Sequence, residues 1–467
     1  MLLSSARVGS SLVDVLIEDG VIASITPATS AGRDLGGRWL SPGLWDNHVH
    51  FSQWSLIQQR LDVSAATSAS HAASLVRDGF DTEHEPFIAY GFRDGLWPDH
   101  PTAALLDAVS STHPIVLVSG DLHAVWLNTP ALALYGHTGD GLLREEPAFE
   151  VTRRIDTVDP LVLDRWAETA ARTAAERGVV GVVDLEMDWN LDTWVRRIDG
   201  GLDSLRVEFG IYTQHLDRAI ELGLRTGQRI NDLLTVGGYK VLTDGSLNTR
   251  TAYCFDAYPG RPDEFGILTM PPHELLPRLR TAVNAGISPV VHAIGDHAVS
   301  LALDSFAELG TGGRMEHAQL VAVDDFARFA ELGVTASVQP DHAMDDRDVA
   351  DRYWAGRTDR TFALRSLLDA GAELALGSDA PVSPLDPWVT AAAAVGRTRG
   401  GREPWHPEQR ISAAQALAAS TRTTVAVGQR ADLIVTATDP WAADASELSE
   451  MRVEATLLGG RFTHDAL

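Results

Sequence analysis

The chain has 467 residues but contains a single cysteine, Cys254, and a single lysine, Lys240. One cysteine excludes an internal disulfide framework and is compatible with a reducing compartment. No uninterrupted apolar run is long enough to cross a membrane, and no Lys or Arg precedes the first short apolar stretch, as a secretion signal would require. We therefore expect an unprocessed cytoplasmic protein.

Positive charge is also scarce, because 38 Lys and Arg residues face 64 Asp and Glu residues, for a formal net charge of -26. A surface of that sign repels the phosphates of nucleic acids and anionic membranes. We expect neither as a partner, and expect a small-molecule substrate instead. The sequence does not fix the oligomeric state, and a homodimer is one of the states that it allows.

Short apolar segments alternate with helical stretches through the middle of the chain, which is the pattern of parallel β/α units. Helices are predicted at 163–177, 273–285 and 360–370. Eight strands, the number that closes a (β/α)8 barrel, are predicted at 43–50, 179–186, 206–212, 236–242, 288–292, 314–317, 334–339 and 373–378. The predicted fold class is α/β with a TIM-like barrel.

Further β-rich segments lie at both ends of the chain. Residues 13–26 surround a hairpin signal at Asp19-Gly20, and two strand-like segments occur near the C-terminus, at 431–437 and 453–462. We predict one small β-sandwich made of residues 1–42 and 425–467.

The barrel would then occupy residues 43–424, interrupted after its first strand. The stretch 51–160 is too long for a loop and carries elements of its own at 115–119 and 131–135. We predict that it is an inserted cap over the carboxyl ends of the barrel strands, where active sites of this fold lie.

Lys240 is the only lysine among 38 basic residues. Arginine keeps its proton in nearly any setting, whereas a buried lysine can lose it and become a nucleophile. A neutral amine can form a Schiff base, or it can take up carbon dioxide to become a carbamate, whose oxygens bind metals. Unless Lys240 is a surface position that simply escaped replacement by arginine, it is a candidate site residue.

Polar side chains gather at the ends of the predicted strands. His48 and His50 lie two residues apart, so on a strand they share one face. His292 ends the fifth strand, His317 ends the sixth and Asp379 follows the eighth. Any one of these histidines could be a hydrogen-bonded core residue. Together with the lone lysine at the end of the fourth strand, they predict a metal site, which would satisfy all of these buried polar groups.

These residues lie within longer motifs. The stretch PGLWDNHVH, the EH after strand six and the SDAP after strand eight resemble the amidohydrolase superfamily. The runs GYKVLTDGSLNTRTA, HAIGDHA, MEHAQL, SVQP and GSDAPV resemble, more narrowly, amidohydrolase family 3, the branch that includes N-substituted formamide deformylase and exoenzyme-regulator-like proteins. The resemblance covers nearly the whole chain, including GDLHAVWLN and DGLLRE in the insertion.

The resemblance implies two divalent cations, expected to be zinc, at the mouth of the barrel. The histidines of the first strand and the aspartate would bind the more buried ion, and the other two histidines the more exposed one. A carbamate on the lysine, derived from carbon dioxide, would bridge them. Related barrels hold a single metal without the lysine bridge, but the lone lysine favours the bridge here. The implied ligands are His48, His50, Lys240, His292, His317 and Asp379.

Water shared by two divalent cations loses a proton near neutral pH. The expected function is therefore a metal-dependent hydrolase that cleaves the C–N bond of an amide, N-substituted or cyclic, with a metal-activated hydroxide. Asp379 would accept the proton of that water and pass it to the departing nitrogen, and the carbamate of Lys240 would hold the cations.

Position and resemblance also predict residues that contact the substrate. Several have a competing structural role: Asp244 could shape a turn with the glycine after it, Arg250 could pair with a carboxylate, and tryptophans are more often packing residues. The predicted substrate-binding residues are Asp121, His123, Trp126, Asp244, Arg250 and Gln339.

Other functions remain open. A single-metal aminohydrolase that deaminates a heterocycle shares the fold, although such enzymes usually place a glutamate three residues after the fifth-strand histidine, where this chain has Gly295. A non-catalytic scaffold would have a broken ligand set, and this set is complete. A Schiff base on Lys240 would leave the histidines unexplained. The fold alone cannot separate these functions.

Overall fold

The computed structural model describes residues 1–29, 32–83 and 85–467. Its internal contacts divide the chain into two compact units. Unit 1 consists of Met1–Phe51, Glu168–Gly245 and Ala252–Leu467, and unit 2 of Ser52–Ala167 and Ser246–Thr251. Within the described residues, no helix combines the length and the apolar character that crossing a membrane requires.

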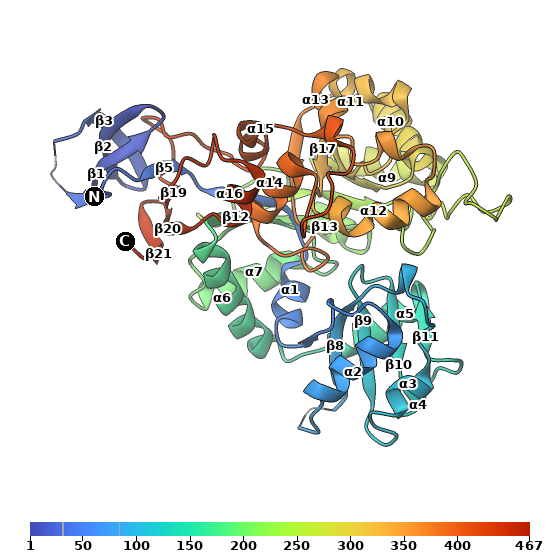
Figure 1. Ribbon diagram of the computed structural model, residues 1–467. Coiled ribbons are helices and arrows are strands. Elements are labelled where there is room, and N and C mark those ends of the chain that lie inside the picture. The colour runs from blue at the N-terminus through green and yellow to red at the C-terminus, as the bar shows by residue number, and fades with distance from the viewer. Residues whose placement is uncertain (30–31, 84) are drawn as a thin grey trace. The chain divides into compact units, whose positions relative to one another are not determined.

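Eight parallel strands form the central sheet of unit 1 (Figure 1). They pair in the order β18-β17-β16-β15-β14-β13-β12-β6. Val49 bridges in parallel to Ala380, just after β18, which brings the two outer strands together. The predicted α/β barrel is confirmed. Its strands are β6 (Leu44–Val49), β12 (Val179–Asp184), β13 (Arg206–Tyr212), β14 (Leu234–Leu242), β15 (Pro289–Ala293), β16 (Gly313–His317), β17 (Val334–Val338) and β18 (Leu374–Leu376).

Helices alternate with these strands along the chain. The predictions 163–177 and 273–285 correspond to α6 (Pro160–Glu176) and α9 (Pro272–Asn284). The predicted helix 360–370 begins later, as α13 (Leu364–Asp369), because Phe362 has a φ of 49°, which an α-helix does not allow. The other helices of unit 1 are α7 (Asn190–Asp199), α8 (Leu216–Glu221), α10 (Asp296–Leu309), α11 (Phe326–Leu332), α12 (His342–Tyr353), α14 (Pro387–Gly396), α15 (Ala413–Ala418) and α16 (Ala445–Ser449).

Strands from both ends of the chain form a second sheet, coloured blue and red in Figure 1. Its order is β21-β20-β19-β5-β1-β2-β3, with β4 beside β1. Leu3 and Leu433 lie in the same apolar core, so the two ends build one β-structure, as expected. The boundaries 1–42 and 425–467 stay predictions. The strands are β1 (Leu2–Val8), β2 (Ser11–Glu18), β3 (Val21–Pro27), β4 (Arg33–Asp34), β5 (Trp39–Pro42), β19 (Leu433–Thr436), β20 (Val453–Leu458) and β21 (Arg461–Asp465).

A tight turn connects two strands of this sheet, and an ion pair connects the sheet to the barrel. Asp19 and Gly20 connect β2 to β3 with φ values of 48° and 76°, the left-handed pair that a tight hairpin turn requires. Arg206 of β13 donates from Nε and Nη2 to the carboxylate of Asp432 at 2.6 and 2.9 Å. Asp432 also accepts from the backbone N–H of Gly459 at 2.7 Å, so this carboxylate joins the barrel to the terminal sheet.

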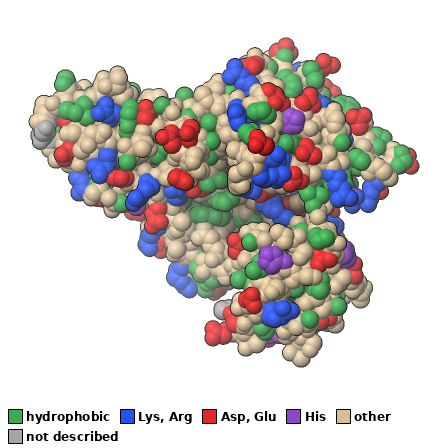
Figure 2. Space-filling view, viewed as in Figure 1, with side chains coloured by type: hydrophobic (Ala, Val, Ile, Leu, Met, Phe, Trp, Pro, Cys, Tyr) green, Lys and Arg blue, Asp and Glu red, His purple; other side chains and the backbone are tan. Residues whose placement is uncertain are grey.

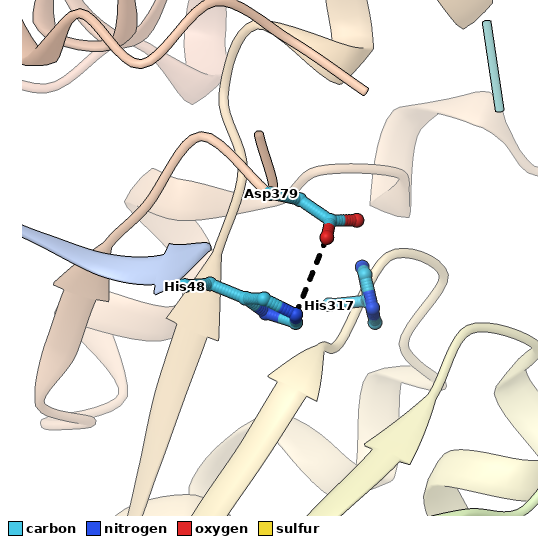
Figure 3. Close-up of side chains that lie close together, drawn as sticks. All are labelled: His48, His317 and Asp379. Carbon is cyan, nitrogen blue, oxygen red and sulfur yellow. Dashed lines mark ion pairs between the residues drawn. The ribbon is translucent and has the colours of Figure 1, made fainter. Parts of the chain in front are cut away.

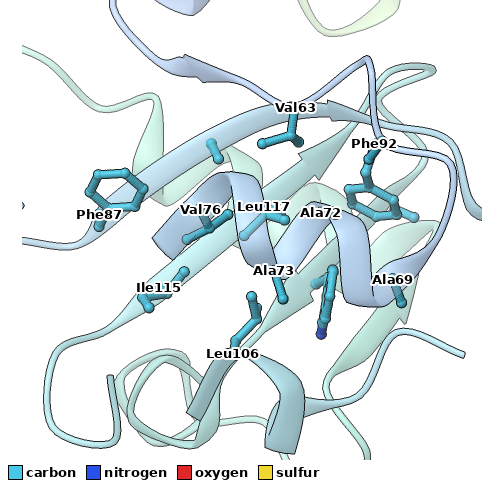
Figure 4. Close-up of a cluster of buried hydrophobic side chains, with 14 residues drawn as sticks. Val63, Ala69, Ala72, Ala73, Val76, Phe87, Phe92, Leu106, Ile115 and Leu117 are labelled. Atoms are coloured by element: carbon cyan, nitrogen blue, oxygen red, sulfur yellow. The ribbon is translucent and has the colours of Figure 1, made fainter. Parts of the chain in front are cut away.

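Unit 2 has its own sheet, with the order β11-β10-β9-β8-β7, and its own core. Figure 4 shows side chains of helix α2, such as Ala72 and Val76, packed against Leu117 of the sheet. The predicted elements at 115–119 and 131–135 correspond to β9 and α4. The elements are α1 (Phe51–Ile57), β7 (Leu61–Asp62), α2 (Ala69–Gly79), β8 (Phe87–Phe92), α3 (Ala103–Asp107), β9 (Ile115–Ser119), β10 (Ala124–Leu127), α4 (Thr129–Tyr135), β11 (Leu142–Arg144) and α5 (Glu146–Ile155).

The excess of carboxylates is distributed over the surface. Figure 2 shows acidic side chains intermixed with arginines on the face in view. Exposed pairs such as Arg402 with Asp348, 2.6 Å apart, form where the two meet. Each such pair contributes little to stability, so the acidic surface is chiefly a solvated one.

Candidate metal centre

The predicted metal ligands all lie in unit 1, in or directly after strands of the barrel. All six side chains belong to buried residues, with exposed fractions from 1% to 7%. Such burial of ionisable groups is costly unless they pair with one another or with a cation. His48 lies in β6 and His50 directly follows it, Lys240 lies in β14, His292 in β15, His317 ends β16 and Asp379 follows β18.

Asp379 lies close to His48 and His50, at the end of β6, and to His317, at the end of β16. Its Oδ1 atom is 3.3 Å from Nε2 of His48 and 3.3 Å from Nε2 of His50. Figure 3 shows His48, His317 and Asp379 directed towards one another. One ligand atom from each of these three lies within 4.8 Å of the others, and this is the one such group found among the described residues. The three could share one cation.

The charge of Asp379 suits a ligand. Burial would raise the pKa of this carboxyl, but the neighbouring imidazoles, His48 foremost, hold it well below its usual value. The carboxylate is therefore ionised at neutral pH, as metal binding requires.

His292 and His317 offer ring nitrogens to a cation. Their ring centroids are 4.4 Å apart, edge to face. Within the described part of the chain, Nε2 of His292 and Nδ1 of His317 are buried without a hydrogen-bond partner. A carboxylate oxygen of Asp244 is 3.5 Å from that nitrogen of His292, too far for a strong bond. Burial, reinforced by His292, puts the pKa of His317 well below its ordinary value. A neutral His317 and two buried ring nitrogens without hydrogen-bond partners among the described residues fit a divalent cation.

Lys240 is buried close to these groups. Burial lowers the pKa of its amine to about 8, against the opposing attraction of Glu316 and Asp379. A neutral amine is therefore accessible much nearer to neutral pH than in an exposed lysine. This environment fits an amine that reacts with carbon dioxide, and the surface alternative for Lys240 does not apply.

Two of the six residues occupy strained backbone positions. His317 has a φ of 72° and Asp379 a φ of 56°, in the left-handed region that costs non-glycine residues about 1–3 kcal/mol each. The strand register pairs His292 with Glu316, not with His317. Side chains alternate along a strand, so a regular β16 would turn His317 away from the face of His292. The left-handed backbone at His317 accounts for its inward direction.

Asp46 fastens the first strand to the last beside the site. Its Oδ1 atom accepts hydrogen bonds from the backbone N–H groups of His48 at 3.2 Å and Ser378 at 2.9 Å. Gly377 permits this approach, because a Cβ atom there would lie 2.7 Å from the backbone nitrogen of His48. Burial raises the pKa of Asp46 to about 7.

The structure adds two residues that the sequence analysis did not single out. Glu316, fully buried, has its Oε2 atom 2.7 Å from Nδ1 of His48. His342, at the start of α12, has its Nε2 atom 4.0 Å from Oδ2 of Asp379 and its ring stacked at 6.2 Å from that of His317. Both lie at or just after strand ends, in MEH and SVQPDH, which is the signal that could have identified them.

Two predicted substrate-binding residues lie in unit 1, and each is engaged by the protein itself. The Asp244 carboxylate accepts from the backbone N–H groups of Tyr253, Ile294 and Gly295 at 2.8–3.0 Å. Gln339 is buried with its Nε2 atom 3.3 Å from Nδ1 of His48. These contacts favour a structural role, in which Asp244 holds loops in place and Gln339 holds the predicted metal ligand His48.

The other four lie in unit 2. Asp121 accepts from the Ser119 hydroxyl at 2.6 Å, and His123 has Nδ1 3.0 Å from Glu145. Trp126 is fully buried and donates its indole N–H to the backbone oxygen of Thr102 at 2.9 Å, which is a packing position. Arg250 belongs to the segment Ser246–Thr251 of the same unit and has a φ of 60°. Substrate contact by these residues stays a prediction.

Comparisons with known proteins agree with this architecture. The chain is 28% identical to Protein LONG AFTER FAR-RED 3 of Arabidopsis thaliana, over 92% of this chain and 82% of that protein. It is 24% identical to N-substituted formamide deformylase of Arthrobacter pascens, over 91% of this chain and 88% of that protein. An uncharacterized metal-dependent hydrolase from Pyrococcus horikoshii OT3 has the same fold, with a TM-score of 0.80 and 24% identity over 95% of this chain and 99% of that one.

A model of the amidohydrolase family matches residues 31–464. The match includes every strand of the barrel and all six predicted metal ligands. The chain belongs to the amidohydrolase family.

Proposed function

We propose that this protein is a metal-dependent hydrolase that cleaves the C–N bond of an amide, N-substituted or cyclic. The observation that carries the proposal is that one ligand atom each from His48, His317 and Asp379 lie within 4.8 Å of one another, although the residues lie in or just after three separate strands. Membership of the amidohydrolase family supports hydrolytic chemistry. The relative named N-substituted formamide deformylase supports amides as the substrate class.

The donors on this chain suit zinc, which prefers imidazole and carboxylate ligands. When bound, divalent cations polarise a carbonyl oxygen and lower the pKa of water. The proposed ligands are His48, His50, Lys240 as its carbamate, His292, His317 and Asp379.

A carbamate on Lys240 would be an anion close to two carboxylates. The amine has a pKa of about 8 and feels the charges of Glu316 and Asp379. These carboxylates would repel an anionic carbamate unless cations lay between them. We therefore expect carbamate formation and metal binding to depend on each other.

Asp379 is the proposed proton carrier. Its Oδ1 atom is the one that His48 and His50 contact, so we assign proton transfer to Oδ2, which faces His342 at 4.0 Å. This oxygen would accept a proton from the attacking water and return it to the departing nitrogen, which changes a poor leaving group into a neutral amine.

Elemental analysis combined with a substrate panel tests the function. Protein purified without added metal is expected to contain two divalent ions per chain and to hydrolyse members of a panel of formamides, hydantoins and N-acyl amines, with loss of both metal and activity on chelation. One ion per chain with deamination of a heterocycle would instead support the single-metal aminohydrolase. A protein that binds no divalent cation would contradict both.

A further inference from the structure

Glu316 is a carboxylate with no exposed surface, at the second-last position of β16. Its two oxygens have different neighbours. Oε1 lies 3.2 Å from Nε and 3.1 Å from Nη2 of Arg314. Oε2 lies 2.7 Å from Nδ1 of His48, although the ring N–H does not point straight at it. The carboxylate therefore stands between a fixed guanidinium and a predicted metal ligand.

Arg314 is held in place by two other strands. Its Nη2 atom donates to the backbone oxygen of Asn47 in β6 at 2.7 Å and to the Ser337 hydroxyl in β17 at 2.9 Å. Because this guanidinium is itself held by β6 and β17, it fixes the position of the Glu316 carboxylate beside His48.

A histidine with a carboxylate at one nitrogen presents its other nitrogen to a metal. A carboxylate oxygen 2.7 Å from Nδ1 favours the tautomer of His48 that carries its proton on Nδ1, which leaves the lone pair on Nε2. Nε2 is the atom that faces Oδ1 of Asp379 at 3.3 Å. Gln339 also approaches Nδ1, at 3.3 Å, but the carboxylate is closer and charged, so it decides which nitrogen carries the proton.

We propose that Glu316 is a positioning residue, backed by Arg314, that fixes the orientation and the protonated nitrogen of His48 so that Nε2 binds a divalent cation. This inference rests on the proposed function, because it needs a metal at His48. It gives Glu316 no contact with the metal or the substrate: its effect passes through the imidazole.

Metal affinity in a double-mutant cycle tests this assignment. Cobalt(II) affinity is measured by competition with a chelator for the wild type, Glu316→Gln, His48→Ala and the double variant. Loss of a partner behind a metal-binding histidine typically costs about 10- to 100-fold in affinity, and we expect a loss of that size in Glu316→Gln. On the His48→Ala background, the same change should cost less than about twofold, because the imidazole through which it acts is gone.

Two further variants guard against a general effect on folding. Glu316→Asp keeps the charge for Arg314 but withdraws the oxygen from Nδ1, and we expect it to lose cobalt affinity as well. Glu208 lies in β13 and pairs with Arg422 at 2.6 Å, and Glu208→Gln should leave affinity unchanged. Circular dichroism of the metal-free proteins establishes that each variant is folded.

The outcomes separate this inference from the proposed function. Equal affinity in the wild type and Glu316→Gln, or an equal loss on both backgrounds, would overturn the positioning role while leaving the metal centre intact. A loss of one bound ion from Glu316→Gln with His48 still ligating would make Glu316 a ligand and also overturn it. A wild type that binds no cobalt would overturn the proposed function, and this inference with it.

Discussion

Oδ1 of Asp379 lies 3.3 Å from Nε2 of His48, so the segment after the last barrel strand meets the side chain of the first. The backbone reinforces the contact, because the N–H of Asp379 donates to the oxygen of His48 at 2.7 Å. Closure of the barrel therefore brings two members of the candidate metal centre, His48 and Asp379, together.

Replacing Asp379 by asparagine should stop turnover while the barrel stays folded. The amide keeps the size of the side chain but cannot receive a proton, and loss of such a group typically costs about 100- to 10,000-fold in rate. Amide hydrolysis would be measured with the metal content of each preparation determined alongside.

Asp192→Asn is the matched control, because Asp192 is exposed and pairs with Arg218 at 2.8 Å on the surface. It should retain full activity. Near-wild-type hydrolysis by metal-loaded Asp379→Asn would show that another group moves the proton.

Replacing Lys240 tests the carbamate. Lys240→Gln removes the amine and with it a proposed ligand, so we expect metal affinity to fall by at least the about 10- to 100-fold that loss of an outer partner of a ligand costs. Lys240→Glu supplies a permanent carboxylate and should retain more metal than Lys240→Gln. NMR of wild-type protein equilibrated with isotopically labelled bicarbonate should show a carbamate signal that disappears when the metal is removed. Equal metal content in all three proteins would argue against the bridge.

Trp126 can be assigned to packing or to substrate binding by a pair of substitutions. Trp126→Ala should destabilise unit 2 by about 3–5 kcal/mol, because it leaves a large cavity beside Phe92, and limited proteolysis of this unit would detect the change. Trp126→Phe keeps an aromatic ring and should preserve activity within about twofold, since a packing role needs bulk more than an indole.

Leu134→Ala in α4 serves as the control for those substitutions, because Leu134 is 47% exposed and should tolerate the change. Loss of activity in a folded, metal-loaded Trp126→Phe would restore the substrate-binding role.

The sole thiol should be protected in the native protein. Cys254 is fully buried, and burial raises the pKa of its thiol to about 12 from an ordinary 9.0. The thiolate is the reactive form, so iodoacetamide should label Cys254 in urea but not in the native protein at mildly alkaline pH. Labelling is read by mass spectrometry, and equal rates in the two conditions would contradict the burial.

The raised pKa of Cys254 also determines whether the free energy of unfolding rises or falls at alkaline pH. Above pH 9.0 the thiol ionises in the unfolded chain but stays protonated in the folded one until about 12. The folded state then binds more protons, so the free energy of unfolding falls as pH rises, by up to about 1.4 kcal/mol per pH unit from this group. Below pH 9.0 the contribution is fully present. Cys254→Ala should lack this slope when the two proteins are compared.

The barrel could be predicted from the sequence because its strands are short apolar runs that end in polar residues. β13 begins and ends at the predicted residues 206 and 212, and the other seven strands differ by a few residues. The hairpin at Asp19-Gly20 was equally accessible, because the dipeptide itself favours the left-handed backbone that the turn needs.

The local geometry of the site could not be predicted from the sequence. A period of two assigns His317 to the wrong face of β16, and a φ of 72° returns it to the site. The position of Glu316 in MEH, at the end of a strand, marks it as a candidate, but only its contact with His48 shows what it does there. The carboxylate of Asp244 was expected to face substrate, but two of its three backbone donors, Ile294 and Gly295, come from a segment fifty residues away, and no spacing rule predicts that.

The terminal sheet can be completed only when synthesis of the chain is nearly finished. β5 emerges from the ribosome early, but its neighbour β19 belongs to the last part of the chain, after every barrel strand has been made. Until then one edge of β5 has no partner and can recruit a strand from another nascent molecule. Chaperones that shield such edges should matter more for the yield of this protein than for that of a barrel whose first strands pair at once.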